Sequence, residues 1–258
     1  MFRYFDAHCH LYMEQFAQDR GDVLQRMKDE GFGAVVIGTD YAQSAQAVEL
    51  ASQHDFLWAS VGLHPNDNRS EQWIDISIQM EELARHPKVV AIGECGLDYF
   101  RSGGTPEEKA MQRERFVSQA KLAQELGKAL IIHCRNAHDD MLEILGELKL
   151  TIPVVIHFFT GSGELAGKYL DLGCYLSFPG PITYTTDYDD SIRVCPLDRM
   201  LSETDSPFAA PVPNRGKRNE PLYVPHIVAK IAAMKGLSED EVAHATVANA
   251  TKVFGLQI

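Results

Sequence analysis

The chain alternates short, mostly apolar runs with longer segments of helical pattern, and this alternation limits its fold more than any other feature. Short apolar runs that alternate with helices are typical of a parallel sheet, because the helices then cover strands that are buried on both faces. We therefore expect eight parallel strands. They are Tyr4–His8, Ala34–Ile37, Leu57–Val61, Val89–Ile92, Ala129–Ile132, Val154–Ile156, Tyr175–Ser177 and Met200–Ser202.

The helical segments carry local start and stop signals. Gly31 follows the first helix, Pro106 stands in the first turn of the longest, and Ser238 with Glu241 three residues later forms a capping-box pattern. The expected helices are Arg20–Glu30, Ala42–Gln53, Glu71–Arg85, Pro106–Leu126, Asp139–Leu148, Glu164–Leu172, Val224–Met234 and a last one opened by Ser238. Eight such units predict an α/β fold closed into a (β/α)8 TIM-type barrel, with an open doubly wound sheet as the alternative.

The lack of internal boundaries and the net charge limit the number of domains and the class of substrate. The sequence contains no linker, internal repeat or low-complexity segment, so we expect residues 1–258 to form a single domain. The formal net charge is -12 at pH 7, from 24 Lys and Arg against 36 Asp and Glu. A protein that coats a long nucleic-acid track needs many cations at the phosphates, so this charge argues against that class. A small substrate, or one bound by its end, remains compatible with it.

The cysteines and the N-terminal segment indicate where in the cell the protein is located. The five cysteines are odd in number and show no CxxC spacing, which argues against a disulfide framework or zinc ribbon and favours a reducing cytosol. Met1–Phe5 run directly into the first strand, so we expect no signal peptide, and no apolar run approaches a membrane-spanning length. We therefore expect a cytoplasmic protein with no membrane association and no obligate protein partner.

Histidines and acids stand at or just after the ends of five expected strands. Because the carboxyl ends of parallel barrel strands converge on one rim, these side chains are expected to meet in one site. Imidazole and carboxylate groups are common metal ligands, so the set indicates a metal-dependent hydrolase. Buried residues with ordinary hydrogen bonds are the alternative for each one taken singly. The candidate ligands are His8, His10, Glu94, His133, His157 and Asp205.

Strand periodicity adds detail to the first of these runs. Residues two apart in a strand share a face, so we expect Asp6, His8 and His10 to point together, and Ala7 and Cys9 to point away. The cysteines that follow expected ligands by one residue are therefore expected to pack against helices as small buried hydrophobes.

Nine short segments form an ordered set along nearly the whole chain. They are Phe5–Leu11, Gly62–Pro65, Gly93–Tyr99, Ile132–Arg135, His157–Gly161, Ser177–Pro181, Glu203–Pro207, Asn219–Pro221 and Asn249–Phe254. In this order they resemble the TatD-like metal-dependent deoxyribonucleases, a branch of the amidohydrolase-type barrels. An HxH pair alone is weak, but the ordered set is specific. One departure is Phe158, where the family often has a small residue or Cys, and we expect it to affect packing or pocket size more than metal binding.

The resemblance implies a site for two divalent ions, Mg, Mn or Zn. It assigns His8, His10 and Asp205 to one ion, His133 and His157 to the other, and Glu94 as the bridge between them. A bridging carboxylate keeps two ions close enough to clamp the attacking and leaving oxygens of a phosphodiester. Asp205 is then the candidate for orienting and deprotonating the attacking water, with a purely ligating role as the alternative.

Other residues are expected on the same rim. His64 follows the third strand and could donate a hydrogen bond to a substrate phosphate. Arg135 could donate two hydrogen bonds to a phosphate or to a ligand carboxylate. For both residues, the alternative role is to hold a metal ligand in position by hydrogen bonding to it, without contact with the substrate. Asp98 and Tyr99 either line the pocket or brace the segment of Glu94, and the sequence leaves this open.

One long loop carries a short basic run. The segment Ser206–Pro221 is rich in proline and contains Arg215, Lys217 and Arg218. Long loops in compact domains are often functional. Short basic runs are also common on surfaces, however, and we interpret this one as a solvated loop.

Three hypotheses for function follow. The resemblance favours a deoxyribonuclease, a 3'-5' exonuclease that acts on single-stranded or frayed DNA ends by a two-metal mechanism. The alternative is a small-molecule hydrolase of the amidohydrolase type, acting on a lactone, amide or phosphotriester. Many of those barrels bridge their metals with a modified Lys at the end of the fourth strand, where this chain has Glu94. A binding barrel with an inactive site is the third hypothesis, and the full ligand set argues against it.

Overall fold

Eight parallel strands form one sheet in the order of the chain, β1 to β8. The computed structural model describes residues 2–66, 73–101 and 104–257. Sequential order confirms the barrel and excludes the doubly wound alternative, which requires the strand order to reverse. The strands are β1 (Tyr4–Cys9), β2 (Phe32–Ile37), β3 (Leu57–Val61), β4 (Val89–Asp98), β5 (Ala129–Arg135), β6 (Val154–Ile156), β7 (Tyr175–Phe178) and β8 (Met200–Ser202).

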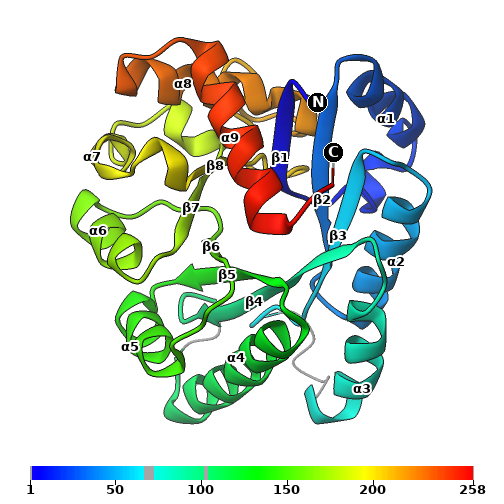
Figure 1. Cartoon of the computed structure of the whole chain (residues 1–258), viewed down its shortest axis with the longest axis vertical. Coiled ribbons are helices and arrows are strands. Elements are labelled where there is room, and N and C mark those ends of the chain that lie inside the picture. The colour runs from blue at the N-terminus through cyan, green and yellow to red at the C-terminus, as the bar shows by residue number, and fades with distance from the viewer. Residues whose placement is uncertain (1, 67–72, 102–103, 258) are drawn as a thin grey trace.

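Helices surround the strands, as Figure 1 shows. The α-helices are α1 (Arg20–Asp29), α2 (Tyr41–Ser52), α3 (Trp73–Ala84), α4 (Pro106–Leu126), α5 (His138–Leu148), α6 (Gly163–Asp171), α7 (Asp189–Val194), α8 (Val224–Lys235) and α9 (Glu239–Phe254). Short 3-10 turns are η1 (Glu14–Phe16), η2 (Gly180–Thr183), η3 (Leu197–Arg199) and η4 (Pro221–Tyr223). The short α7 was not expected from the sequence, and the first two residues of the expected helix Glu71–Arg85 lie outside the described residues.

Local capping chemistry explains where the longer helices begin and end. Ser238 accepts from the backbone N–H of Glu241, whose carboxylate reaches back to Ser238, so the capping box expected at the start of α9 is confirmed. Thr105 and Glu108 form a second capping box before α4. Helix α4 ends at Gly127, whose φ of 63° lies in the left-handed region that glycine adopts without steric cost.

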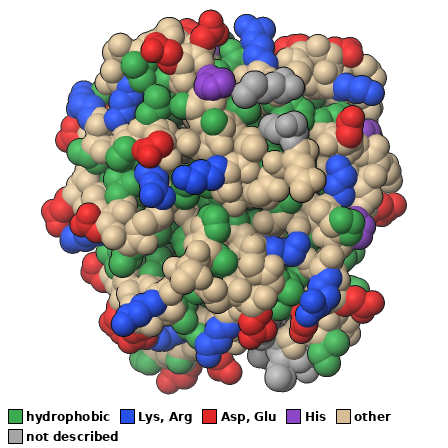
Figure 2. Space-filling view, in the orientation of Figure 1, with side chains coloured by type: hydrophobic (Ala, Val, Ile, Leu, Met, Phe, Trp, Pro, Cys, Tyr) green, Lys and Arg blue, Asp and Glu red, His purple; other side chains and the backbone are tan. Residues whose placement is uncertain are grey.

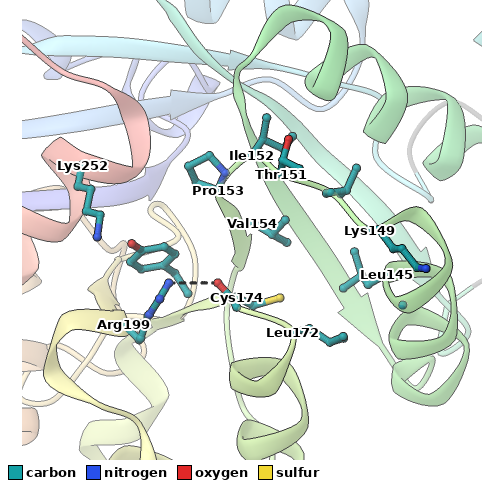
Figure 3. A pocket seen from close by; sticks show the side chains of 14 residues that line it. Leu145, Lys149, Thr151, Ile152, Pro153, Val154, Leu172, Cys174, Arg199 and Lys252 are labelled. Atoms are coloured by element: carbon teal, nitrogen blue, oxygen red, sulfur yellow. Dashed lines mark hydrogen bonds between the residues drawn. The ribbon is translucent and has the colours of Figure 1, made fainter.

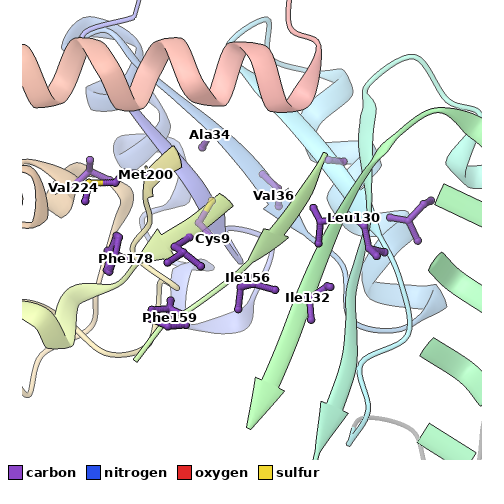
Figure 4. Packing of buried hydrophobic residues seen from close by; sticks show 14 of the residues in the cluster. Cys9, Ala34, Val36, Leu130, Ile132, Ile156, Phe159, Phe178, Met200 and Val224 are labelled. Atoms are coloured by element: carbon purple, nitrogen blue, oxygen red, sulfur yellow. The ribbon is translucent and has the colours of Figure 1, made fainter. Parts of the chain in front are cut away.

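The core has two layers separated by the barrel wall. One layer lies between strands and helices, and Figure 4 shows its members, among them Val36, Leu130, Ile132 and Ile156. The other fills the barrel and continues into α9, with residues such as Phe254 against Phe5. The strand arrows in Figure 4 point away from the helix that crosses above them, α9 in Figure 1. Helix α9 therefore covers the amino ends of the strands, and the carboxyl rim lies at the opposite end.

The barrel closes at the carboxyl rim, beyond the end of β8. Cys9 and Ser206 form an isolated parallel bridge. The backbone N–H of Asp205 donates to the carbonyl of His8 at 2.9 Å, and that of His10 donates to Ser206 at 2.7 Å. The closing hydrogen bonds therefore bring Asp205 beside His8 near the end of β1 and beside His10 just after it, although almost 200 residues separate them in the chain.

Strands β4 and β5 extend several residues beyond their expected ends, and β1 and β7 extend by one residue. Strand β4 was expected to end at Ile92, but its pairing with β5 continues through Gly96 with His133 and Asp98 with Arg135. The reason is long-range pairing, which overrides the polar and glycine-rich local sequence. His133 therefore lies within the paired strands, and Glu94 lies at the register irregularity of β4 between Ile92 and Cys95.

Strict alternation fails at the end of β1. Ala7 belongs to the layer inside the barrel and Cys9 to the layer under the helices, so the expectation that they share a face was wrong. The physical reason is a register irregularity between Asp6 and Cys9, which shifts the side-chain pattern. Cys9 and Cys95 are buried among the hydrophobic residues under the helices, as expected, and all five cysteines are free thiols.

Candidate metal centre

Imidazoles from four strand ends converge on the carboxylate of Glu94. Its Oε1 lies 2.8 Å from Nδ1 of His133, 3.0 Å from Nε2 of His157 and 3.5 Å from Nε2 of His64. Its Oε2 lies 3.3 Å from Nε2 of His8. Both oxygens of Glu94 therefore face imidazoles, and these come from opposite sides of the rim.

One half of the cluster joins the ends of β1 and β8. Oδ1 of Asp205 lies 3.4 Å from Nε2 of His10 and 3.6 Å from Nε2 of His8. Nδ1 of His10 lies 2.9 Å from the backbone carbonyl of Ile37, which orients the ring so that Nε2 faces the cluster. These three side chains lie together as the sequence analysis expected.

The other half joins β4, β5 and β6. His133 faces Glu94 with Nδ1 and lies 3.1 Å from Oδ2 of Asp98 with Nε2. His157 faces Glu94 with Nε2 and lies 3.1 Å from Oε1 of Glu203 with Nδ1. The rings of His157 and His8 stack with centroids 3.8 Å apart, which brings the two halves into contact.

Two acidic side chains contact these histidines on the side away from Glu94: Asp98 contacts His133 and Glu203 contacts His157. Neither contact was assigned from the sequence. Glu203 is fully buried, and its Oε1 also accepts the backbone N–H of Phe158 at 2.7 Å. Phe158 has a φ of 49°, a left-handed conformation that is rare for a bulky residue, and this hydrogen bond helps to hold it. The available signal was position, since Asp98 ends β4 and Glu203 directly follows β8.

The charges of the cluster are strongly coupled. Burial raises the pKa of Glu94, but His157, His64 and His133 outweigh burial and hold the pKa well below its ordinary value. Burial lowers the pKa of His157, but Glu94 and Glu203 outweigh it and raise that pKa well above its ordinary value. The buried carboxylates thus attract positive charge, which protons or divalent cations can supply.

Unsatisfied atoms show that the residues fit a metal. His8 is buried, and among the described residues its Nδ1 has no hydrogen-bond partner, while its Nε2 has only the long contacts to Glu94 and Asp205 at 3.3 and 3.6 Å. Oε2 of Glu203 is also buried, and it has no hydrogen-bond partner among the described residues. Buried polar atoms without partners are costly, and ligation of a cation would satisfy them. Three sets of ligand atoms come within 4.8 Å of one another: His8, His10 and Glu94; His8, His157 and Glu203; and His64, Glu94 and His133.

His64 braces the cluster from beside it. Its Nδ1 accepts the backbone N–H of Asn66 at 3.1 Å, so the proton of the neutral ring stands on Nε2 and faces Glu94. Burial, with the neighbouring His133, lowers the pKa of His64 to about 3, which keeps the ring neutral. The geometry fits the alternative in which His64 fixes a ligand carboxylate.

Arg135 and Arg218 differ in whether they pair with a carboxylate. Arg135 is exposed, and its guanidinium lies 4.0 Å from the centre of the Phe100 ring, with no carboxylate paired to it among the described residues. Arg218 forms a two-pronged pair with Asp19 at 2.6 and 2.7 Å. Arg135 is therefore available to a substrate, whereas Arg218 anchors its loop and the interpretation of a merely solvated loop was wrong for that residue.

A groove of about 420 Å³ lies at the amino end of the barrel, away from this cluster (Figure 3). It is lined by aliphatic side chains and by Lys149, Arg199 and Lys252, and none of its lining residues is His, Asp or Glu. Figure 2 shows the molecule from the side of α9, where acidic side chains lie mostly near the outline. Cys174 is the one common metal-ligand side chain in this lining, so the groove lacks the imidazole and carboxylate set found at the carboxyl rim.

A parallel barrel with imidazole and carboxylate groups at its carboxyl rim defines the class of metal-dependent barrel hydrolases. The chain belongs to the TatD related DNase family, whose model matches residues 5–255. This confirms the resemblance found in the sequence.

Individual relatives span the whole chain. A Bacillus subtilis protein named "Uncharacterized metal-dependent hydrolase YabD" is 39% identical over 97% of this chain and 98% of its own. A Klebsiella pneumoniae protein named "3'-5' ssDNA/RNA exonuclease TatD" is 36% identical over 98% of each chain. The crystal structure of YJJV, a TatD homologue from Escherichia coli K12, superposes with a TM-score of 0.90 at 31% identity over 99% of each chain. The chain is thus a metal-dependent hydrolase of the TatD family.

Within residues 2–66, 73–101 and 104–257, no helix combines the length and the apolar character needed to cross a bilayer.

Proposed function

We propose that this protein is a single-domain exonuclease that removes nucleotides from the 3' end of single-stranded DNA with two divalent ions. The observation that carries the proposal is the buried Glu94, whose two oxygens face imidazoles on opposite sides of the rim at 2.8 to 3.5 Å. A carboxylate in that position serves two cations at once, and paired cations suit the in-line displacement of a phosphodiester. Relatives that carry the name 3'-5' ssDNA/RNA exonuclease support the choice of substrate.

In this proposal the cluster divides between two ions as the sequence analysis expected. His8, His10 and Asp205 hold one ion, His133 and His157 hold the other, and Glu94 bridges them. When bound, the ions polarise the phosphate and make the attacking water more acidic. Glu203 orients His157 through its Nδ1, and Asp98 orients His133 through its Nε2.

Asp205 is the proposed general base. Its side chain is 16% exposed, more than the 5% of Glu94, so it is the more accessible of these two carboxylates to solvent and substrate. Oδ1 faces the histidines of β1, which leaves Oδ2 to orient and deprotonate the attacking water. In this proposal Arg135, which is exposed on the same rim, meets a phosphate beside the scissile one.

The test is a substrate panel measured with Mg, Mn and Zn and without metal. Single-stranded DNA labelled at its 5' end should shorten stepwise from its 3' end only when metal is present, and elemental analysis should find about two divalent ions per chain. Hydrolysis of a lactone, amide or phosphotriester without cleavage of DNA would replace the proposal by the small-molecule alternative. Binding of no more than one ion per chain at high metal concentration would contradict the two-metal mechanism.

A further inference from the structure

We infer that Phe100 and Phe208 are stacking surfaces for nucleic-acid bases on the two sides of the metal centre. The inference rests on the proposed nuclease function and specifies how the site holds a single strand. Phe100 is 59% exposed and Phe208 is 44% exposed. Each of these exposed rings lies next to a residue of the candidate metal centre, Phe208 beside His10 and Phe100 beside Asp98, which distinguishes them from apolar side chains scattered singly over a surface.

Phe208 stands beside the half of the cluster that joins β1 and β8. Its ring centroid lies 6.1 Å from that of His10. Its backbone N–H donates to the carbonyl of Asp205 at 2.9 Å, and its carbonyl accepts from Nδ2 of Asn219 at 2.7 Å. Asn219 is fully buried and also donates to the carbonyl of Thr204. The hydrogen bonds that position Phe208 thus come from its backbone, and its ring is left for a ligand.

Phe100 is tied to the other half through Asp98. Oδ2 of Asp98 lies 3.1 Å from Nε2 of His133, while Oδ1 accepts the backbone N–H groups of Phe100 and Arg101 at 2.9 Å. One carboxylate therefore sets the position of the Phe100 turn relative to the candidate ligand. The guanidinium of Arg135 covers one face of the ring, so a base stacks on the opposite face while the guanidinium meets a phosphate.

The charge of the protein favours this mode of binding. With a net charge of -12, broad contact with phosphates cannot supply the affinity. Every base has a π-face, so stacking on aromatic rings holds a strand without regard to its sequence. Bases in a duplex are already stacked on one another, so the two rings select single strands.

The experiment measures binding rather than turnover. Asp205→Asn protein loaded with Mn²⁺ is titrated into fluorescent single-stranded DNA, with and without Phe100→Ala or Phe208→Ala. Each substitution should weaken binding roughly 5- to 150-fold, the range that corresponds to losing one stacked base. Phe208→Trp keeps an aromatic face and should retain the affinity. Leu172→Ala is the matched control, because Leu172 is 43% exposed and lines the groove at the amino end.

Abasic DNA separates stacking from every other effect of the substitutions. An oligonucleotide that lacks its 3'-terminal bases should bind Phe100→Ala, Phe208→Ala and the parent protein almost equally. Thermal melting and Mn²⁺ titration of each variant show that fold and metal site are intact. Equal weakening on natural and abasic DNA, or no weakening at all, overturns the inference.

This inference and the proposed function can fail separately. Metal-dependent cleavage of single strands together with unchanged DNA binding by both phenylalanine variants would overturn only the stacking surfaces. Absence of DNA cleavage with every metal, together with absence of DNA binding, would overturn the proposed function and the stacking surfaces with it.

Discussion

Replacement of Glu203 by Gln tests whether a buried acid outside the named ligand set tunes the metal centre. Oε1 of Glu203 lies 2.7 Å from the backbone nitrogen of Phe158 and 3.1 Å from Nδ1 of His157. Gln keeps the size of the side chain and one carbonyl oxygen, but it removes the negative charge behind the imidazole. The backbone hydrogen bond of Phe158 can therefore persist while the bond to His157 loses its ionic character.

The two hydrogen bonds set the expected magnitude. A hydrogen bond to a charged group contributes about 1.5–3 kcal/mol and a neutral one about 0.5–1.5 kcal/mol, so the change costs about 1–1.5 kcal/mol. At about 1.4 kcal/mol for each factor of ten, the affinity for a metal at His157 should fall about tenfold, within the usual effect of losing an outer partner of a ligand. A loss above about a hundredfold would indicate instead that Glu203 itself binds the ion, as its unpartnered Oε2 allows.

Isothermal titration with Zn²⁺ or Mn²⁺ provides the measurement, with circular dichroism and thermal melting as controls for the fold. Ser162→Ala is a suitable comparison, since Ser162 caps the nearby helix α6 without a contact to the cluster in the described hydrogen bonds. Unchanged metal affinity in Glu203→Gln would refute the claim that this acid orients His157. It would also show that the 3.1 Å contact has no energetic weight in the metal-bound protein.

Three further outcomes follow from the site. Asp205→Asn should lower turnover by about a hundredfold or more at saturating metal with the fold intact, whereas Glu94→Ala should also lose metal; near-normal hydrolysis by Asp205→Asn would exclude its role as the base. Log affinity for single-stranded DNA should fall with log salt at a slope of about -1 to -3, and closed circles should resist cleavage; rapid cutting of circles or a slope near -6 would indicate an extended groove and an endonuclease. Asn219→Ala leaves two carbonyl groups without their donor, so urea unfolding should show a loss of about 2–4 kcal/mol, and a loss below about 0.5 kcal/mol would contradict the anchoring of that loop.

The convergence of the candidate ligands was predictable from strand ends alone. His8, His133 and His157 stand where short apolar runs finish, and the rim of a parallel barrel is where such ends meet. The same reasoning could not find the role of Asp98, because the run that precedes it contains two glycines and was interpreted as a loop. Only pairing with β5 extends β4 to Asp98 and turns its carboxylate toward His133.

Contacts between loops that are distant in the chain could not be predicted from the sequence either, because they also depend on tertiary packing. Arg135 has equal chemical access to a phosphate, a carboxylate or an aromatic ring, and the described conformation selects the ring of Phe100. Arg218 looks like a solvated cation in the sequence, yet the fold brings Asp19 within 2.6 Å of it. Long charged side chains reach many partners, so their choice depends on how loops from different parts of the barrel pack.

The sequence by itself determined the order of strands and helices and the chemical groups at the strand ends, because periodicity, caps and turn residues act over a few neighbouring positions. Only the tertiary structure decided which of those groups face one another. Asp205 meets His8 and His10 because backbone hydrogen bonds close the barrel beyond β8, and Glu203 meets His157 across strands 46 residues apart in sequence. Such contacts depend on register, on irregularities such as the one between Asp6 and Cys9, and on closure of the whole barrel, none of which is encoded in any one segment.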